Sequence, residues 1–255
     1  MNYSLVDVIA LERSEIVANA SMNRQRNLTG KDSYEKELGH NPLTFLLERL
    51  NKQRDAAWLD LCCGAGRALI QTATNLQNYQ LGSKVRLIGI DLVPLFDPIP
   101  PGTDSLLLEA TSVRLWRTNR KFDLITCVHG LHYVGDKLGL IQMAAGWLSG
   151  EGLFLAHLDY DNLRFIDGTS KRFQIGRDLH AAGFRYQPRR HLLTSRGLRG
   201  AAFQYEYVGA DVKAGANYTG QPSVDSFYRR PSSSQSSRTR RCMVGQKLSG
   251  PAKIA

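Results

Sequence analysis

The chain of 255 residues carries a net charge of +10, with 42% hydrophobic and 22% charged residues, a composition typical of a soluble globular protein. It has no apolar run near the roughly 18 residues that a membrane-spanning helix needs, and no basic cluster opens its N-terminus as in a signal peptide. Adjacent Cys62 and Cys63, among four cysteines, make a poor disulfide framework, so we expect a cytoplasmic protein.

The positive charge is concentrated at the C-terminus. No acidic residue follows Asp225, whereas seven basic residues do, and removing these leaves 26 basic against 23 acidic residues. The Ser-rich, basic segment 229–255 has no apolar periodicity and is predicted to be a disordered tail. A nucleic-acid partner would therefore bind through the tail, because the rest of the chain is nearly neutral.

Apolar stretches and turn signals alternate along the chain. Asn41 and Pro42 are typical of the N-cap and first position of a helix, and Gly183 of a helix end. The pattern predicts helices over 42–50, 67–76, 137–148 and 171–182, and strands over 57–61, 85–90, 105–108, 122–128, 153–158, 191–195 and 201–208.

This alternation predicts βαβ units and a parallel sheet that is buried on both faces. The short turn between 191–195 and 201–208 suggests that these two strands pair as an antiparallel hairpin at the end of the sheet. The expected organisation is an N-terminal helical extension or lid over 1–50, an α/β domain over 51–228 and the tail over 229–255.

Three groups at the ends of the first three strands predict a cofactor site. Asp60-Leu61-Cys62-Cys63-Gly64-Ala65-Gly66 joins a strand to a helix, where glycines allow the backbone to approach a ligand. Asp91, followed by Leu92, ends the second strand, where a carboxylate can accept the hydroxyls of a ribose. Glu109 and Ala110 end the third strand and suit the edge and face of an adenine ring.

The sequence resembles the class I methyltransferases that depend on S-adenosylmethionine. Asp60, Gly64 and Gly66 match the family's first motif, and Cys62 stands where the family has a glycine. The resemblance implies the Rossmann-like methyltransferase fold, a seven-stranded, mostly parallel sheet with a C-terminal antiparallel hairpin and helices on both faces. It also implies that S-adenosylmethionine is the cofactor, bound by Asp60, Cys62, Gly64, Ala65, Gly66, Asp91, Leu92, Glu109, Ala110 and Cys127.

Two segments, DLCCGAGRAL and TCVHGLHYVGDKL, are also similar to those of a bacterial subgroup of these enzymes. A nicotinamide-dependent dehydrogenase is the main competing interpretation, but Leu69 occupies the third position of the G-x-G-x-x-G motif. A P-loop is excluded because G-x-x-x-x-G-K-[ST] does not occur.

His129 and His132 follow the fourth strand and are the candidate catalytic residues, since a histidine can act as a general base toward a methyl acceptor. Tyr34, Tyr133 and Tyr218 are candidates for the substrate pocket or its lid. No metal is predicted, because only Cys127 lies near the H-x-x-H pair in the sequence.

A small-molecule acceptor, methylated on O, N or C, is the first hypothesis. An RNA methyltransferase assisted by the tail, and a non-catalytic protein that binds S-adenosylmethionine, are the alternatives.

Overall fold

The computed structural model of the protein describes residues 4–18, 25–53, 55–167, 172–197 and 203–230. The helices are α1 (Val8–Glu12), α2 (Glu15–Ala18), α3 (Tyr34–Leu38), α4 (Pro42–Lys52), α5 (Arg67–Asn78), α6 (Lys137–Trp147) and α7 (Arg172–Ala181). The strands are β1 (Ala56–Leu61), β2 (Val85–Asp91), β3 (Leu106–Ala110), β4 (Phe122–Cys127), β5 (Leu148–His157), β6 (Leu163–Phe165), β7 (Arg185–Gln187), β8 (Leu192–Arg196), β9 (Glu206–Asp211) and β10 (Asp225–Arg229). Of the tail predicted over 229–255, Arg229 is the last residue of β10, and residues 231–255 lie outside the described residues.

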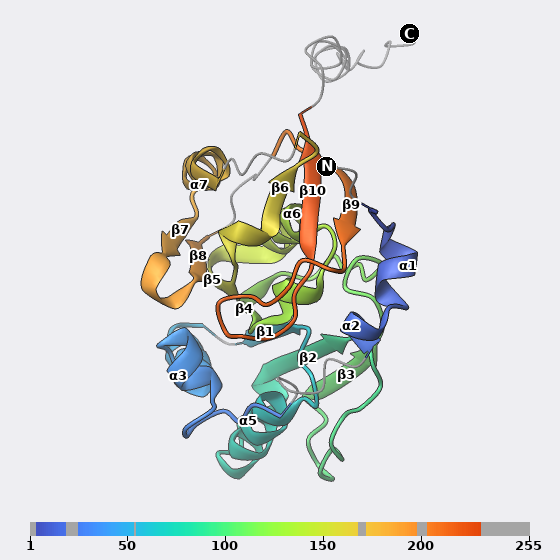
Figure 1. Cartoon of the computed structure of the whole chain (residues 1–255). Coiled ribbons are helices and arrows are strands. Elements are labelled where there is room, and N and C mark those ends of the chain that lie inside the picture. The colour runs from blue at the N-terminus through green and yellow to red at the C-terminus, as the bar shows by residue number, and fades with distance from the viewer. Residues whose placement is uncertain (1–3, 19–24, 54, 168–171, 198–202, 231–255) are drawn as a thin grey trace, which may run out of the picture.

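A seven-stranded sheet forms the centre of the molecule, in the order β3-β2-β1-β4-β5-β8-β7 (Figure 1). The first five strands in this order pair in parallel, and β8 is antiparallel to both of its neighbours. All six residues of β1 and of β4 are buried, as expected for strands covered on both faces. The predicted Rossmann-like fold is confirmed.

The predicted composition of the terminal hairpin is wrong. Strand β8 pairs with β7, which the sequence pattern had not indicated, and not with residues 203–208, the described part of the predicted partner. Both edges of β8 are already occupied, by β5 and β7, so no backbone groups remain for a further strand. Strand β9 instead joins a second sheet of three strands, in the order β6-β10-β9.

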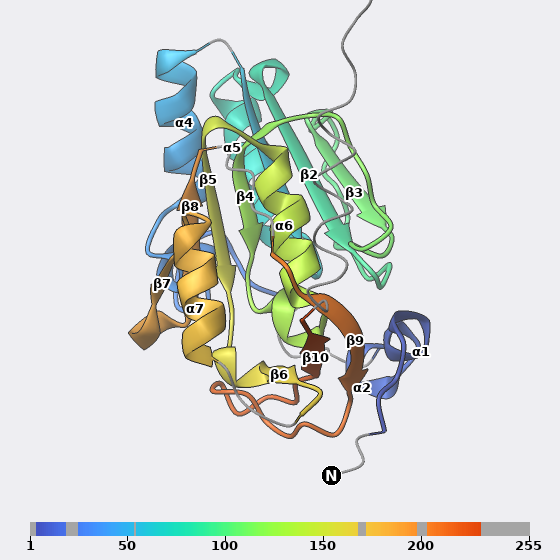
Figure 2. The same cartoon turned by 90° about the horizontal axis from the view of Figure 1, so that it is seen from above.

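Helices cover both faces of the large sheet. Figure 2 shows α4 and α5 on one side and α6 and α7 on the other. Apolar residues from α4 and α5, including Leu46 and Leu69, pack in one buried cluster. Ile141 of α6 and Ile175 of α7 belong to the cluster of the other face. No helix within the described parts of the chain has the length and apolar character to cross a membrane.

The small sheet is fixed to the large one by a buried lysine at the start of α6. The Lys137 ammonium group donates hydrogen bonds to the carbonyls of Val134 and Val224, at 2.9 and 2.7 Å, and to the Ser226 hydroxyl, at 2.8 Å. Burial lowers the pKa of Lys137 to about 7, although nearby carboxylates such as Asp225 oppose the shift.

This pKa predicts a pH-dependent stability. Above pH 7 the folded protein releases a proton that the unfolded chain keeps up to about pH 10, so the free energy of unfolding should rise with pH. Urea unfolding of the wild type and of Lys137→Met at pH 7 and pH 9 tests this. The wild type should gain about 2 kcal/mol relative to the variant between these pH values. An equal change in the free energy of unfolding of the two proteins between pH 7 and pH 9 would contradict the prediction.

Candidate active site

A pocket opens at the carboxyl ends of the parallel strands, the edge where ligands bind in open α/β sheets. Its volume is about 950 Å³ with its open mouth included, and its wall combines Gly64 of the glycine turn, Asp91 of β2 and His129 after β4. Helix α1 forms the remaining side, with Leu11 and Glu12.

The glycine turn between β1 and α5 is held in a conformation that favours glycine. Cys62, Gly64 and Gly66 have φ angles of 58°, 60° and 76°. Cys62, where the family has a glycine, therefore adopts a left-handed backbone with a side chain present, at a modest steric cost. The Gly64 N–H donates a 2.9 Å hydrogen bond to the Asp91 carboxylate, so the turn and the end of β2 are locked together.

Asp91 is buried and lines the pocket beside Leu92. Its second oxygen accepts a 3.0 Å hydrogen bond from the Val93 N–H. A carboxylate has about four acceptor positions, and this one stands in the wall of the pocket.

At the end of β3, the pocket is lined by residues other than the expected ones. Glu109 and Ala110 are not among its lining residues, and Glu109 accepts a 3.2 Å hydrogen bond from the Trp116 indole. Ser112 and Val113, just beyond, face the pocket instead. The Ser112 hydroxyl donates a 2.5 Å hydrogen bond to Glu12 of α1, a contact across 100 residues that local sequence patterns do not indicate.

Asp60 lies beneath the pocket rather than in its wall. The carboxyl group is 1% exposed and accepts hydrogen bonds from the Tyr34 and Thr126 hydroxyls, both at 2.6 Å. The Trp58 indole donates a 2.8 Å bond to the Thr126 hydroxyl. Burial raises the pKa of Asp60 to about 7, against the opposing effect of the two hydrogen bonds.

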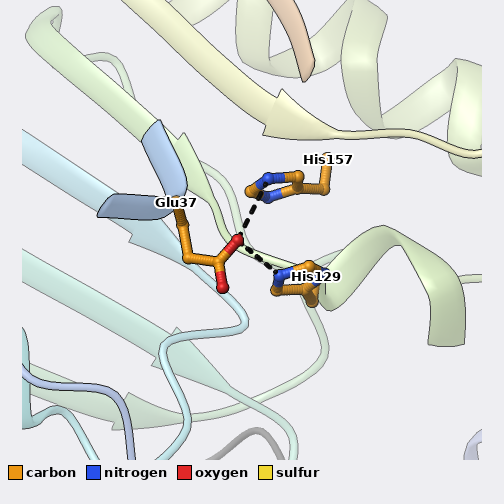
Figure 3. A group of neighbouring side chains, drawn as sticks. All are labelled: Glu37, His129 and His157. Carbon is orange, nitrogen blue, oxygen red and sulfur yellow. Dashed lines mark ion pairs between the residues drawn. The ribbon is translucent and has the colours of Figure 1, made fainter. Parts of the chain in front are cut away.

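A cluster of aromatic and charged side chains lies at the carboxyl ends of β4 and β5. His129 follows β4 with a left-handed φ of 58°, and His157 ends β5, the neighbouring strand. Their imidazole rings stack in parallel, with centroids 4.2 Å apart and planes 5° apart. Glu37 reaches this pair from α3 (Figure 3).

Glu37 divides its two oxygens between partners. One accepts a 2.6 Å hydrogen bond from Arg26, and the other lies 3.1 Å from His129 Nε2 and 3.6 Å from His157 Nε2. Burial opposes the ionisation of Glu37, but the contact with His129 and the charges of His129 and Arg26 outweigh it and lower the pKa to about 2. Glu37 is therefore a carboxylate at neutral pH.

The remaining members of the cluster surround His129. His132 stacks at 5.7 Å from it but is completely buried and does not line the pocket. Burial, together with the neighbouring positive charges, lowers the pKa of His132 well below its usual value. Tyr218 places its hydroxyl 3.4 Å from His129 Nδ1 and stacks on His191, with ring centroids 3.7 Å apart.

Burial also lowers the pKa of His157, to about 3, so this imidazole is neutral at physiological pH. Tyr133 lines the pocket, whereas Cys127 lies below it, completely buried and in contact with Cys62. Ala65 is buried in the glycine turn and does not line the pocket.

Glu37, His157 and His191 were missed in the sequence. His157 could have been found, because it ends a predicted strand at the same sheet edge as His129. Glu37 and His191 carry no local signal, since their positions depend on how α3 and β8 pack against the sheet.

Residues 32–207 match the family described as Methyltransferase domain. The match covers more than half of the chain, so the protein belongs to this family of methyltransferases, the class I type dependent on S-adenosylmethionine that its sequence resembles. No protein with a curated function matches the sequence significantly.

Several crystal structures are similar. The plantazolicin methyltransferase BpumL, in complex with a monoazolic desmethylPZN analog and SAH, shows 17% identity and a TM-score of 0.36 over 45% of this chain and 43% of that one. Coclaurine N-methyltransferase, bound to N-methylheliamine and SAH, shows 17% identity and a TM-score of 0.38 over 60% of this chain and 45% of that one. The N-methyltransferase NodS from Bradyrhizobium japonicum WM9, in complex with SAH, shows 19% identity and a TM-score of 0.39 over 75% of this chain and 97% of that one. The matched region thus spans less than half the length of the first two enzymes.

The bond between Tyr34 and Asp60 generates a prediction for stability. Replacing Tyr34 with Phe removes a hydrogen bond to a buried carboxyl group whose pKa is about 7. The loss in free energy of unfolding should be about 1 kcal/mol at pH 6, where the group is mostly neutral, and about 2 kcal/mol at pH 8, where it is mostly charged. Urea unfolding measures both values, with Tyr79→Phe, at an exposed position, as the control. Equal losses at the two pH values would argue against an ionising Asp60.

Proposed function

We propose that the protein transfers the methyl group of S-adenosylmethionine to a small-molecule acceptor that binds beside His129. The observation that carries this proposal is the continuity of one pocket, from Asp91 and the glycine turn at one end to His129 at the other. A donor and an acceptor in one enclosed space can be aligned for a direct displacement, in which proximity and orientation supply much of the rate.

The residues of the pocket fit the parts of the cofactor. The Asp91 carboxylate in the pocket wall suits the two ribose hydroxyls, and Leu92 and Val113 offer apolar surface to an adenine ring. The oxygens of Glu12 and Ser112 suit the exocyclic amino group of adenine. Gly64 lets the backbone approach without a Cβ. When bound, S-adenosylmethionine supplies an activated methyl group, so the chain has to bind the cofactor, align it with the acceptor and exclude water.

The acceptor end is assigned to His129 rather than to His132. Only His129 lines the pocket, and the strained backbone at this residue is the kind of feature that is retained at functional positions. His132 and His157 support its ring from the sides. Tyr218 and Tyr133 would border the acceptor, and Tyr34 acts from below by holding Asp60.

Cofactor binding is tested with two matched carboxylate variants. Asp91→Asn should weaken the binding of S-adenosylhomocysteine at least about 10-fold, as for loss of a hydrogen bond to a charged group. Glu109→Gln should leave it unchanged, because Glu109 faces Trp116 outside the pocket. Calorimetry measures both affinities. Unchanged binding by Asp91→Asn, or a large loss in Glu109→Gln, would place the adenosine elsewhere.

The acceptor class is tested by labelled methyl transfer from S-adenosylmethionine into the small-molecule and RNA fractions of a cell extract. We expect label in the small molecules, and equal activity in a chain that ends at Arg230. His129→Asn should reduce turnover roughly 100-fold with little change in affinity for S-adenosylhomocysteine, whereas His180→Asn, at an exposed position, should not. Label only in RNA, or lost on truncation, would favour the nucleic-acid alternative. No transfer into either fraction would favour the non-catalytic one.

A further inference from the structure

Three side chains from distant parts of the chain meet at the acceptor end of the pocket: Glu37 of α3, His129 after β4 and His157 of β5 (Figure 3). Each offers one ligand atom, and the three atoms lie within 4.8 Å of one another. Two imidazoles and one carboxylate are a frequent ligand set for zinc and for non-haem iron.

The separations of these atoms are those of ligands around a common centre. Glu37 Oε2 lies 3.1 Å from His129 Nε2 and 3.6 Å from His157 Nε2. Ligands at about 2.1 Å from a tetrahedral metal are about 3.4 Å apart, so both distances from Glu37 match a shared ion. The two ring planes lie 5° apart, so one imidazole has to rotate out of the stack for both in-plane lone pairs to reach that ion.

An ion pair alone accounts poorly for this arrangement. His129 Nε2 is buried and has no partner with hydrogen-bond geometry among the described residues, despite its proximity to Glu37. The 3.6 Å separation at His157 is too long for a hydrogen bond. Two parallel imidazoles 4.2 Å apart would also repel each other if both were charged. Neutral imidazoles are the form that binds a metal.

Surrounding groups contact two of the three ligands, Glu37 and His129, in the manner of a metal site. Arg26 binds one oxygen of Glu37 at 2.6 Å and leaves the other directed at the imidazoles. The Tyr218 hydroxyl lies 3.4 Å from His129 Nδ1, so the second nitrogen of that ring also has a polar neighbour. Partners of this kind fix ring orientation and tautomer at metal centres.

We propose that Glu37, His129 and His157 bind one divalent transition-metal ion of the zinc, cobalt or iron(II) type. Three protein ligands leave at least one coordination position open, as in catalytic metal sites. His129 lines the pocket, so the open position would face the acceptor. In this arrangement His129 acts as a ligand, in place of the general-base role expected from the sequence.

The charge of the site selects the acceptor, a step that rests on the proposed function. A dication beside Arg26 is offset by only one carboxylate in this group, Glu37, so an anionic oxygen ligand is favoured. A phenol or enol hydroxyl meets this requirement, because it loses its proton to solvent when it binds the ion. Its oxygen then forms the bond to the methyl carbon as the carbon–sulfur bond breaks, and that electron pair stays on the sulfur of S-adenosylhomocysteine.

The test uses the full chain without a histidine tag, freed of metal by dialysis against a chelator, and titrated with Co²⁺. The wild type should bind about one Co²⁺ per chain with a visible absorption band, and added azide should shift that band by occupying the open position. Glu37→Gln and His157→Asn should lose the band. Glu35→Gln, on the exposed side of α3, and His180→Asn are the matched controls and should keep it.

Binding of S-adenosylhomocysteine, measured on the same samples, shows that each variant is folded and separates this inference from the proposed function. Wild type that binds S-adenosylhomocysteine but neither Co²⁺ nor Zn²⁺ would overturn the metal site and leave the methyltransferase assignment intact. A band retained in both ligand variants would also overturn it. A band insensitive to azide would contradict the acceptor role of the ion. Metal binding without any methyl transfer would count against the proposed function alone.

Discussion

The buried hydrogen bond between the Tyr34 hydroxyl and Asp60 determines where the N-terminal part of the chain meets the sheet. Asp60 is fixed in β1 and is held from the other side by Thr126 of β4. Tyr34 packs edge-to-face on Trp58, with ring centroids 6.0 Å apart, so α3 is docked by one polar contact and one apolar contact. Glu37 lies three residues along the same short helix and faces the same side. The position of its carboxylate over His129 therefore follows from a bond made beneath the pocket.

Burial of the histidines has a second effect, which acts through charge. The low pKa values of His132 and His157 mean that the cluster contains several imidazoles without the mutual repulsion of several cations. Glu37 remains ionised among them because Arg26 and His129 compensate its burial. The acceptor end of the pocket thus combines two neutral imidazoles, those of His132 and His157, with one fixed carboxylate.

The sequence predicted those parts of the fold that depend on local pattern. β1, β2 and β4 are short apolar runs bounded by turns, and the glycine turn is recognisable because its backbone angles require small residues. It did not predict β7, a strand of three residues, or the transfer of β9 to a second sheet, because these depend on which sheet edges remain free. The same limit applies to the site. Asp91 and His129 lie at strand ends and could be located, whereas Glu12 and Glu37 reach the site from α1 and α3, through contacts between distant segments. Glu109 was selected at a strand end, but the lining begins three residues later, at Ser112.

Helix α1 closes one side of the pocket, and its residue Leu11 is fully buried in an apolar cluster with Ala210 and Val224. The preceding residue Val6 exchanges two backbone hydrogen bonds with Ala210 of β9, at 2.9 and 3.0 Å, and Glu12 binds Ser112 at the other end of the helix (Figure 1). The side of the pocket that α1 forms is therefore positioned by β9 and not by the strands that carry the other walls. A change in the packing of the small sheet would alter the pocket, although no described residue of β6, β9 or β10 lines it.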